Sequence, residues 1–469
     1  MSEIITWSAV ETVRRLKNRD VSAVEVTEAH LARLAAVNPK LNACVQDVPD
    51  AMEQASAIDE TGGESLLAGA PVTTKINTDQ RDLPNSNGLP GLANHIAEED
   101  APVVANLRQA GGVIIGRTNT PEFSLRWCTS NPLHGVSLNP WNHEHTPGGS
   151  SGAAAAAVAS GIGVLAHGND LGGSIRYPAF CCGIAGLKPS IGRIPAWNPS
   201  APAERPPVVT LMSVQGPIAR SVADVQLGLA AMRSHSPNDP NWTSAPANGR
   251  LRKEGRGRIA FVPHPFSSET HPALAQAVED ARLAAKNAGF ETVMLDLPET
   301  ERCANLWGRL LFTETQTMME ESIRSLGSSH LQGWIDQFTQ HFEKFDLKGY
   351  MRAMSERYSL QRLWAQMFEE VDFVVMPTSL LPPFENDLDF NDPTQAKTII
   401  EAQKPLCVVN LIGLPALALP TGLSNGLPIG VQIVGPMHDD DAVIEVGLMM
   451  EKGLGNVLDS MPAPYGLSS

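Results

Sequence analysis

Two short segments carry residue types that could perform hydrolytic chemistry. The first, His143-Glu144-His145, holds two imidazoles and a carboxylate, which are common metal ligands. Residues i and i+2 do not share a helix face and no third ligand is evident, so this spacing argues against a metal site. The second, residues 148–152 (GGSSG), matches G-x-S-x-G, a strand-to-helix turn that presents a nucleophilic serine. That turn needs a buried strand directly before it, whereas residues 142–147 are polar, so the context does not support it.

A longer set of motifs is more specific than either segment. Lys75 lies in PVTTKIN (71–77), PGGSSG occupies 147–152, and GNDLGGSIRYP occupies 168–178. This combination resembles the amidase signature family of serine hydrolases. The resemblance covers the whole chain and is strongest over about 70–195. Further segments that fit it are 116–123, 130–135, 139–141, 186–190, 413–416 and 426–432.

The resemblance implies that Lys75, Ser150 and Ser174 form a Ser-cisSer-Lys triad, with a cis Gly149–Ser150 peptide and with Ser174 as the nucleophile. A serine hydroxyl needs a base to become a useful nucleophile, and here the base would be neutral Lys75 acting through Ser150. A free lysine has a pKa near 10.4, so half neutrality at pH 7 requires a fall of about 3.4. Burial alone lowers a lysine pKa by up to roughly 3–5, which is sufficient.

The same resemblance assigns the groups around the triad. Backbone N–H groups of Leu171, Gly172, Gly173 and Ser174 would form the oxyanion hole, and glycines allow the close approach. Cys128, Thr129 and Ser130 would contact the substrate, in a pocket lined by 127–131, the loop after 176 and the 303–370 helices. The expected reaction cleaves the C–N bond of a small carboxamide through an acyl-Ser174 intermediate, giving a carboxylic acid and ammonia or an amine. No metal and no organic cofactor is required.

Four positions depart from the family pattern: Ile76 replaces a usual acidic residue, Asn169 and Leu171 stand where Thr or Ser is common, and Ala153 replaces a frequent glycine. They leave the substrate open, including anilides, esters and carbamates. Asp170 and Arg176 match the pattern and are expected to brace the active-site loop.

Two other functions remain open at this point. The A subunit of a tRNA-dependent amidotransferase shares the signature, but this chain continues after 192–195 with Ala196-Trp197-Asn198-Pro199 and lacks the serine-rich stretch expected of that subunit. A non-catalytic binding protein on the same fold is the second alternative, because a fold does not fix a function.

Composition limits the partners and the compartment. The 469 residues carry a formal charge of −16, which disfavours binding to nucleic acid. The six cysteines lack zinc spacing and are expected to be free thiols in a reducing compartment. No signal peptide is visible, and the longest apolar run, 153–166, is too short to span a bilayer. We therefore expect a cytoplasmic protein that binds no membrane, with a homodimer left open.

The elements that position these residues alternate along the chain. Ser8/Glu11 and Ser22/Glu25 fit capping boxes for two helices, the second ending at Asn38-Pro39. Helices are expected at 101–110, 151–160 and 273–288, and strands near 71, 113–116, 163–167, 258–262 and 291–295. Strands that alternate with helices favour an α/β fold around a mostly parallel sheet, and the resemblance implies a single large mixed sheet sandwiched between helices. We expect one domain over 1–469 with its core motifs at about 65–195, a helical insertion at about 300–370 and an exposed loop at 234–257.

Overall fold

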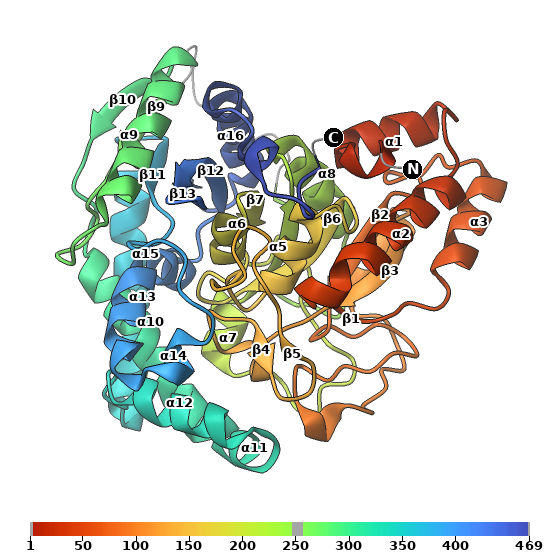
Figure 1. Ribbon diagram of the computed structural model, residues 1–469. Helices are drawn as coiled ribbons and strands as arrows, with labels where there is room; N and C mark the ends of the chain where they lie inside the picture. Colours follow the sequence, from red (N-terminus) through yellow and green to blue (C-terminus); the bar gives the residue numbers. More distant parts are fainter. Residues whose placement is uncertain (1–2, 246–256, 468–469) are drawn as a thin grey trace.

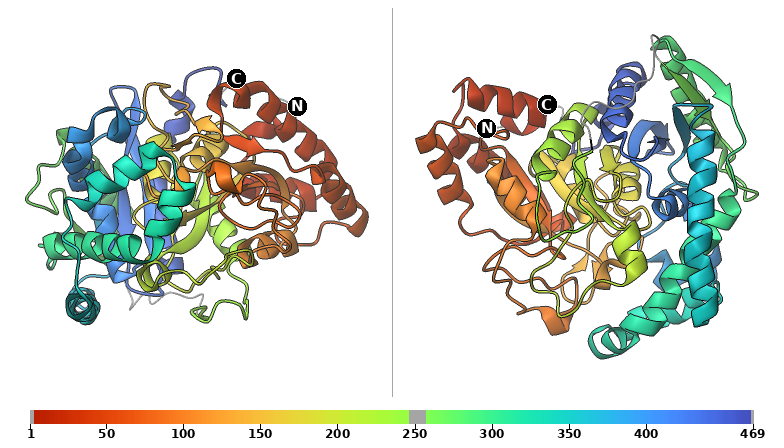
Figure 2. Two further views of the ribbon diagram at one scale, coloured as in Figure 1. Left: turned by 90° about the horizontal axis from the view of Figure 1, so that it is seen from below. Right: turned by 180° about the vertical axis from the view of Figure 1, so that it is seen from behind.

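The computed structural model describes residues 3–245 and 257–467. The expected loop at 234–257 lies partly outside these ranges, and its described residues, 234–245 and 257, contain neither helix nor strand. The first and last described segments of the chain lie on the same side of the molecule, and Ile5 and Leu467 both approach Gly161 (Figures 1 and 2).

Within the described residues, eleven strands form one mixed sheet in the order β1-β3-β2-β6-β8-β7-β12-β13-β11-β9-β10. In chain order these strands are β1 (Cys44–Gln46), β2 (Pro71–Lys75), β3 (Val113–Thr118), β6 (Leu165–Asp170), β7 (Ala185–Lys188), β8 (Val214–Ala219), β9 (Arg258–Phe261), β10 (Glu291–Met294), β11 (Phe373–Pro377), β12 (Ala416–Ser424) and β13 (Leu427–Val434). Two short strands, β4 (Ser130–Asn131) and β5 (Gly135–Val136), form a separate hairpin.

The expectation of a mostly parallel sheet is wrong, because the centre of the sheet is antiparallel. Parallel pairing is confined to β2 with β3 and β6, and to β9 with β10 and β11. The remaining pairs, which link β6, β8, β7, β12, β13 and β11 across the middle and β1 to β3 at the edge, are antiparallel. The mixed sheet implied by the family resemblance is therefore the correct description.

Helices cover both faces of this sheet (Figures 1 and 2). In chain order they are α1 (Ala9–Lys17), α2 (Ala23–Leu41), α3 (Ala51–Thr61), α4 (Pro102–Gln109), α5 (Gly152–Ala159), α6 (Arg176–Cys182), α7 (Pro207–Met212), α8 (Val222–Met232), α9 (Pro272–Asn287), α10 (Thr300–Glu314), α11 (Glu320–Leu326), α12 (Ser329–Thr339), α13 (Leu347–Met367), α14 (Leu388–Asn391), α15 (Ala396–Ile412) and α16 (Asp440–Leu454). Helix α16 packs against both α8 and α9, all three pack against central strands, and α5 and α6 pack together beside the segment that carries Ser174.

Helices α1 and α2 begin where their capping residues predict, but α2 ends later than predicted. Ser22 and Glu25 form a complete capping box at the start of α2. Ser8 caps α1, but the Glu11 carboxylate pairs with Arg14 and Arg15 instead of completing a box. Helix α2 continues through Pro39 to Leu41, because a proline in the last turn removes only one N–H donor.

The 300–370 region forms α10 to α13, as expected, and these helices lie on the side of the molecule opposite α1 to α3 (Figure 1). Their aromatic side chains pack together, with the rings of Trp334 and Phe338 4.1 Å apart and those of Phe312 and Phe342 5.2 Å apart. Among the described residues, no helix combines the length and the apolar character needed to cross a membrane.

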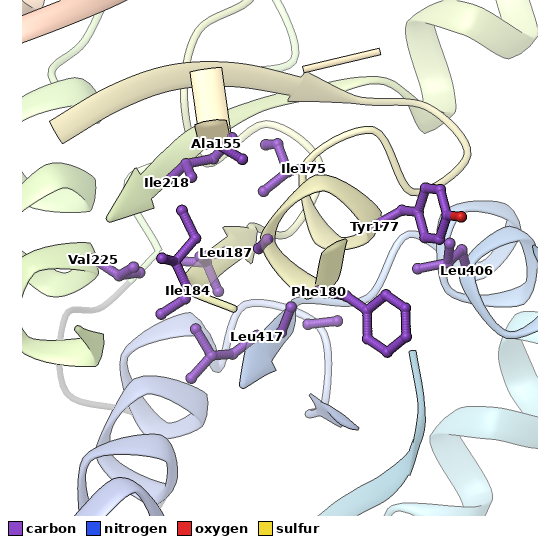
Figure 3. Packing of buried hydrophobic residues seen from close by; sticks show 14 of the residues in the cluster. Ala155, Ile175, Tyr177, Phe180, Ile184, Leu187, Ile218, Val225, Leu406 and Leu417 are labelled. Carbon is purple, nitrogen blue, oxygen red and sulfur yellow. The ribbon is translucent and has the colours of Figure 1, made fainter. Parts of the chain in front are cut away.

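Helix α5 shows why this sequence needs alanine. All eight of its residues are buried, so no face of the helix is free for a larger side chain. Ala155 faces a core that includes Ile175, Ile184 and Ile218 (Figure 3). Small side chains therefore allow α5 to pack tightly beside the strand and loop that carry the functional residues.

We expect Ala156→Leu to destabilise the protein by about 1–3 kcal/mol, because three added carbons have no space in a closely packed site. Thermal or urea unfolding measures the change. The matched control is Ala36→Leu, at an exposed position of α2, which should leave stability within about 0.5 kcal/mol of the parent. Equal stability of the two variants would show that α5 is less tightly packed than described.

Candidate active site

Lys75 is the last residue of β2, and its side chain is fully buried. Its Nζ lies 2.7 Å from Ser150 Oγ, 2.8 Å from Asn169 Oδ1 and 3.2 Å from Ser151 Oγ. Asn169 is itself fixed, because its Nδ2 donates to Asn77 Oδ1 at 3.0 Å. The amine is therefore held by three neutral oxygen atoms and touches no carboxylate.

Burial holds the pKa of Lys75 well below its usual value, and the charge of Asp170 opposes this effect only in part. The other nearby titratable side chain, His167, has its pKa lowered to about 4 by burial and is neutral at pH 7. Asp170 is balanced by Arg176, which donates to both of its carboxylate oxygens. The surroundings thus favour the neutral amine.

Ser150 lies directly after a cis peptide bond, Gly149–Ser150. A Cβ at Gly149 would come within 2.5 Å of the Arg126 carbonyl oxygen and 2.7 Å of the Cys128 nitrogen. Only glycine fits at this position, since real Cβ atoms do not approach backbone this closely. The backbone of 126–128 therefore packs against the peptide that carries Ser150.

Ser174, the predicted nucleophile, lies in a loop between β6 and α6, which we therefore name the nucleophile loop (171–174), and only 9% of its surface is exposed. Every carbonyl of this loop accepts one hydrogen bond. The donors are Trp307 Nε1 to Leu171 (3.0 Å), Trp127 Nε1 to Gly172 (2.8 Å), Tyr177 N to Gly173 (2.7 Å) and Ser151 N to Ser174 (3.2 Å). The orientation of each peptide plane is therefore fixed.

The N–H groups of the nucleophile loop divide into two kinds. The Gly173 N–H donates to Asp170 Oδ1 at 2.8 Å, which differs from the expectation that it serves an oxyanion. The N–H groups of Leu171, Gly172 and Ser174 have no acceptor among the described residues. Three of the four expected donors are thus free for a ligand, and the fourth holds the loop to Asp170.

The two glycines of this loop meet different constraints. Gly173 has φ +104°, and a Cβ there would lie 2.4 Å from Leu406 Cδ1. A Cβ at Gly172 would lie 2.5 Å from Trp307 Cζ2. Gly173 is therefore needed for backbone conformation as well as space, whereas Gly172 allows the indole of Trp307 to rest on the loop.

Asp170 and Arg176 brace the loop, as the sequence predicted. Burial alone would raise the pKa of Asp170, but Arg176 outweighs it and the pKa falls to about 2. Arg176 also donates to Gln432 Oε1 (2.7 Å), to the Leu406 carbonyl (3.1 Å) and to Asn410 Oδ1 (2.5 Å). The loop is thereby tied to the last third of the chain.

Cys128, Thr129 and Ser130 lie beside Gly149, but their side chains are engaged within the protein. Thr129 Oγ1 donates to the Gly148 carbonyl at 2.8 Å, and Ser130 Oγ donates to Asp387 Oδ1 at 2.5 Å. Burial raises the pKa of the Cys128 thiol, which leaves it protonated. Contact of this segment with substrate stays a prediction, whereas the hydrogen bonds of Thr129 and Ser130 tie the segment to Gly148 and Asp387.

Arg126 organises the acidic groups next to this segment. Its guanidinium donates to Asp389 and Asp387 and lies over the ring of Phe390, 3.3 Å from the centroid. Cys128, Asp387 and Asp389 form the one group of metal-ligating atoms that come within reach of one another among the described residues. Both carboxylates are already paired with the Arg126 guanidinium. Residues 143–145 do not form a group of metal-ligating atoms.

A cavity of about 350 Å³ has no lining residue from the nucleophile loop itself, but it reaches the two tryptophans that contact the loop. Trp127 and Trp307, whose rings are 6.3 Å apart and whose N–H groups hold the loop, form part of its wall. The other lining residues are Glu301, Ala304, Asn305, His341, Phe342, Lys397, Ile400, Glu401, Lys404 and Cys407. Its size and aromatic wall suit a small organic molecule.

The comparisons with known proteins agree on one family. A sequence model named Amidase matches residues 25–444. An indoleacetamide hydrolase from Bradyrhizobium diazoefficiens is 41% identical over 455 residues, covering 96% of this chain and 87% of that protein. The A subunit of a glutamyl-tRNA(Gln) amidotransferase from Roseiflexus castenholzii is 32% identical, covering 95% of this chain and 96% of that one. Among solved structures, a bacterial aryl acylamidase of the amidase signature family aligns with a TM-score of 0.82 at 26% identity, covering 95% and 96% of the two chains.

These matches establish that the chain belongs to the amidase family. It is a hydrolase that acts on amides, and the amidotransferase subunit is a more distant relative than the indoleacetamide hydrolase. The alternative of a non-catalytic binding protein is accordingly set aside.

We expect Gly173→Ala to reduce amide hydrolysis by about 10²-fold or more, because the φ of +104° and the contact with Leu406 would force the nucleophile loop to move. Steady-state kinetics measures the loss. The matched control is Gly333→Ala in α12, where a Cβ meets no atom within 4 Å. That control should keep full activity and gain up to about 1 kcal/mol of stability. Full activity of Gly173→Ala would contradict the described loop geometry.

Proposed function

We propose that this chain hydrolyses an aryl-substituted acetamide, with indole-3-acetamide as the first candidate, through an acyl-Ser174 intermediate. The observation that carries the proposal is the contact of 2.7 Å between the buried Lys75 amine and Ser150 Oγ, beside a loop that offers free N–H groups. A base, a hydroxyl relay and oxyanion donors are what a serine hydrolase without histidine needs.

Lys75 acts as the base in its neutral form. A neutral amine has two hydrogens and one lone pair, which matches its three partners. The hydrogens point to Asn169 Oδ1, which accepts only, and to Ser151 Oγ. The lone pair then faces the Ser150 hydroxyl, which is the arrangement required to accept a proton from it.

In acylation, Ser174 Oγ attacks the amide carbonyl carbon, its proton moves to Ser150, and the Ser150 proton moves to Lys75. The carbonyl electron pair shifts to the oxygen, which accepts hydrogen bonds from the free N–H groups of Leu171, Gly172 and Ser174. Collapse of this intermediate breaks the C–N bond, and Lys75 returns the proton through Ser150 to the leaving nitrogen. Water repeats the sequence on the acyl-enzyme and releases the carboxylic acid.

The substrate class is supported by the cavity and by the relatives. Trp127, Trp307 and Phe342 give the cavity an aromatic wall on which a planar aryl group stacks favourably. The similar proteins are an indoleacetamide hydrolase and an aryl acylamidase, both named for aromatic amides. A small aryl acetamide would place its carbonyl at the nucleophile loop and its ring against the indoles.

The proposal extends to the setting of the enzyme. The six cysteines are free thiols and are buried, which suits a reducing cytoplasm. One sheet joins strands from β1 to β13, which supports a single domain over the whole chain. The reaction described needs no metal and no organic cofactor.

We expect Ser174→Ala to lower kcat/KM for indole-3-acetamide by about 10³-fold or more, since the nucleophile is lost. Ammonia release is measured for indole-3-acetamide and phenylacetamide, aniline release for an anilide, and phenol release for an aryl ester. Ser355→Ala, on the exposed side of α13, is the control and should keep parent activity. Substantial activity of Ser174→Ala would contradict the assignment of Ser174 as nucleophile. A parent enzyme that hydrolyses neither indole-3-acetamide nor phenylacetamide would contradict the proposed substrate class.

The pH dependence tests the base. Only neutral Lys75 can accept a proton, so activity should rise with pH through the lowered pKa of Lys75 and be lost below it. Asn169→Asp places a carboxylate where an oxygen now lies 2.8 Å from Nζ. A negative charge stabilises the ammonium form, so the acid limb of kcat/KM should move upward by about 1–3 pH units.

Asn169→Ser serves as the control, because it keeps a neutral oxygen near Lys75. Its acid limb should stay at the parent position, even if kcat falls. The assignment of Lys75 as base fails if Asn169→Asp leaves the limb unmoved.

A further inference from the structure

Two indole N–H groups reach the nucleophile loop from elements far apart in the sequence. Trp127 lies in the segment before β4, whereas Trp307 lies on α10, in the helical region outside the family motifs. Trp307 Nε1 donates to the Leu171 carbonyl at 3.0 Å, and Trp127 Nε1 donates to the Gly172 carbonyl at 2.8 Å. Both rings are buried, so these bonds are made in a region of low dielectric constant.

A peptide unit is planar, so fixing its C=O also fixes the N–H at its other end. In a trans peptide the two point in opposite directions. Trp307 therefore sets the direction of the Gly172 N–H, which is free to bind an oxyanion. Trp127 sets the next plane, whose N–H at Gly173 donates to Asp170, so that plane is held at both ends.

We propose that Trp307 and Trp127 are positioning residues that hold the oxyanion hole in shape, with Trp307 as the more important of the two. The inference rests on the proposed acyl-Ser174 chemistry and deepens it. Of the two indoles, only that of Trp307 fixes a peptide plane that carries a free donor. The peptide plane that Trp127 contacts is also held by Asp170, which accepts from the Gly173 N–H. Loss of the Trp127 hydrogen bond therefore leaves the bond to Asp170 in place.

A purely packing role for these rings makes a different prediction. Phenylalanine keeps an aromatic ring in the cavity wall and removes only the N–H donor. If packing alone matters, Trp→Phe should affect substrate binding and not the chemical step. If the N–H bonds position the loop, Trp→Phe should weaken stabilisation of the transition state and leave substrate binding unchanged.

The experiment uses the full chain with Trp307→Phe, Trp127→Phe and the control Trp364→Phe. Trp364 is also buried, and its Nε1 also donates to a backbone carbonyl, that of Pro298 at 3.1 Å, away from the nucleophile loop. For each variant we would measure kcat and KM on indole-3-acetamide, the pH profile, and inhibition by indole-3-acetaldehyde and by indole-3-acetic acid.

The aldehyde reports on the oxyanion hole directly. Ser174 Oγ bonds to the aldehyde carbon, the carbonyl electron pair moves to oxygen as an oxyanion, and the Ser174 proton passes through Ser150 to Lys75. No group leaves, so the adduct resembles the intermediate of the amide reaction. The carboxylic acid binds without forming this bond and reports on binding of the ring.

We expect Trp307→Phe to lose about 10–100-fold in kcat and in aldehyde affinity, with KM and acid affinity changed by less than about threefold. Trp127→Phe should show the same pattern with a smaller loss, and Trp364→Phe should match the parent. The pH profiles should coincide, since neither indole bonds to Lys75. Parent-like kcat in Trp307→Phe, or equal loss of aldehyde and acid affinity, overturns the proposal.

Two further measurements distinguish failure of this proposal from other failures. Thermal unfolding shows whether Trp307→Phe folds. If it does not fold, the proposal is tested with Trp127→Phe, which should lose more affinity for the aldehyde than for the acid. If the parent does not hydrolyse indole-3-acetamide, the substrate proposal fails, and p-nitrophenyl acetate tests the loop instead because its hydrolysis forms the same oxyanion. If Ser174→Ala stays active, the proposed nucleophile fails, whatever the tryptophan variants do.

Discussion

The burial of one amine without a contacting counter-ion is the constraint on which the site depends. A lysine taken out of water either finds a carboxylate or gives up its proton, and Lys75 meets only neutral oxygens. The charge of Asp170, which opposes this effect, is already paired with Arg176. The fold therefore uses this buried charge pair to brace the loop, and burial favours the neutral form of the lysine. Such a lysine is the base that the proposed mechanism uses in place of a histidine.

The loop beside this amine is fixed by bonds to its carbonyls, which leaves its N–H groups free. Four donors from four parts of the chain hold the carbonyls of 171–174. An N–H in a loop would ordinarily find water or an internal acceptor, and three here have no protein partner among the described residues. Such donors would need no rearrangement when a negative oxygen forms, which is what the proposed mechanism requires of them.

The sequence could predict the parts of the site that depend on local motifs. Lys75, Ser150 and Ser174 were implied by the family resemblance that short motifs carry, and the structure places Lys75 beside Ser150 and shows the expected Asp170–Arg176 brace. Trp307 could not be assigned, because its role depends on α10 crossing the nucleophile loop, a contact between residues 136 positions apart. The role of Arg126 could not be predicted either, since its partners Asp387 and Asp389 lie more than 250 positions away in the sequence.

The same limit applies to the sheet. The alternation of strands and helices predicted the layers correctly, but it carried no information on strand direction, and the centre proved antiparallel. Direction is set by long connections, such as the one that brings β12 between β7 and β13. Pairings of this kind are determined by packing of the whole core (Figure 3), which no short window of sequence contains.

The bonds from Arg176 to residues 406, 410 and 432 also make the loop depend on parts of the chain that are synthesised late. The three proposed catalytic residues lie within the first 174 positions, whereas these partners of Arg176 lie on α15 and β13. A growing chain therefore contains the proposed catalytic residues for most of its synthesis before the full set of bonds that brace their loop can form.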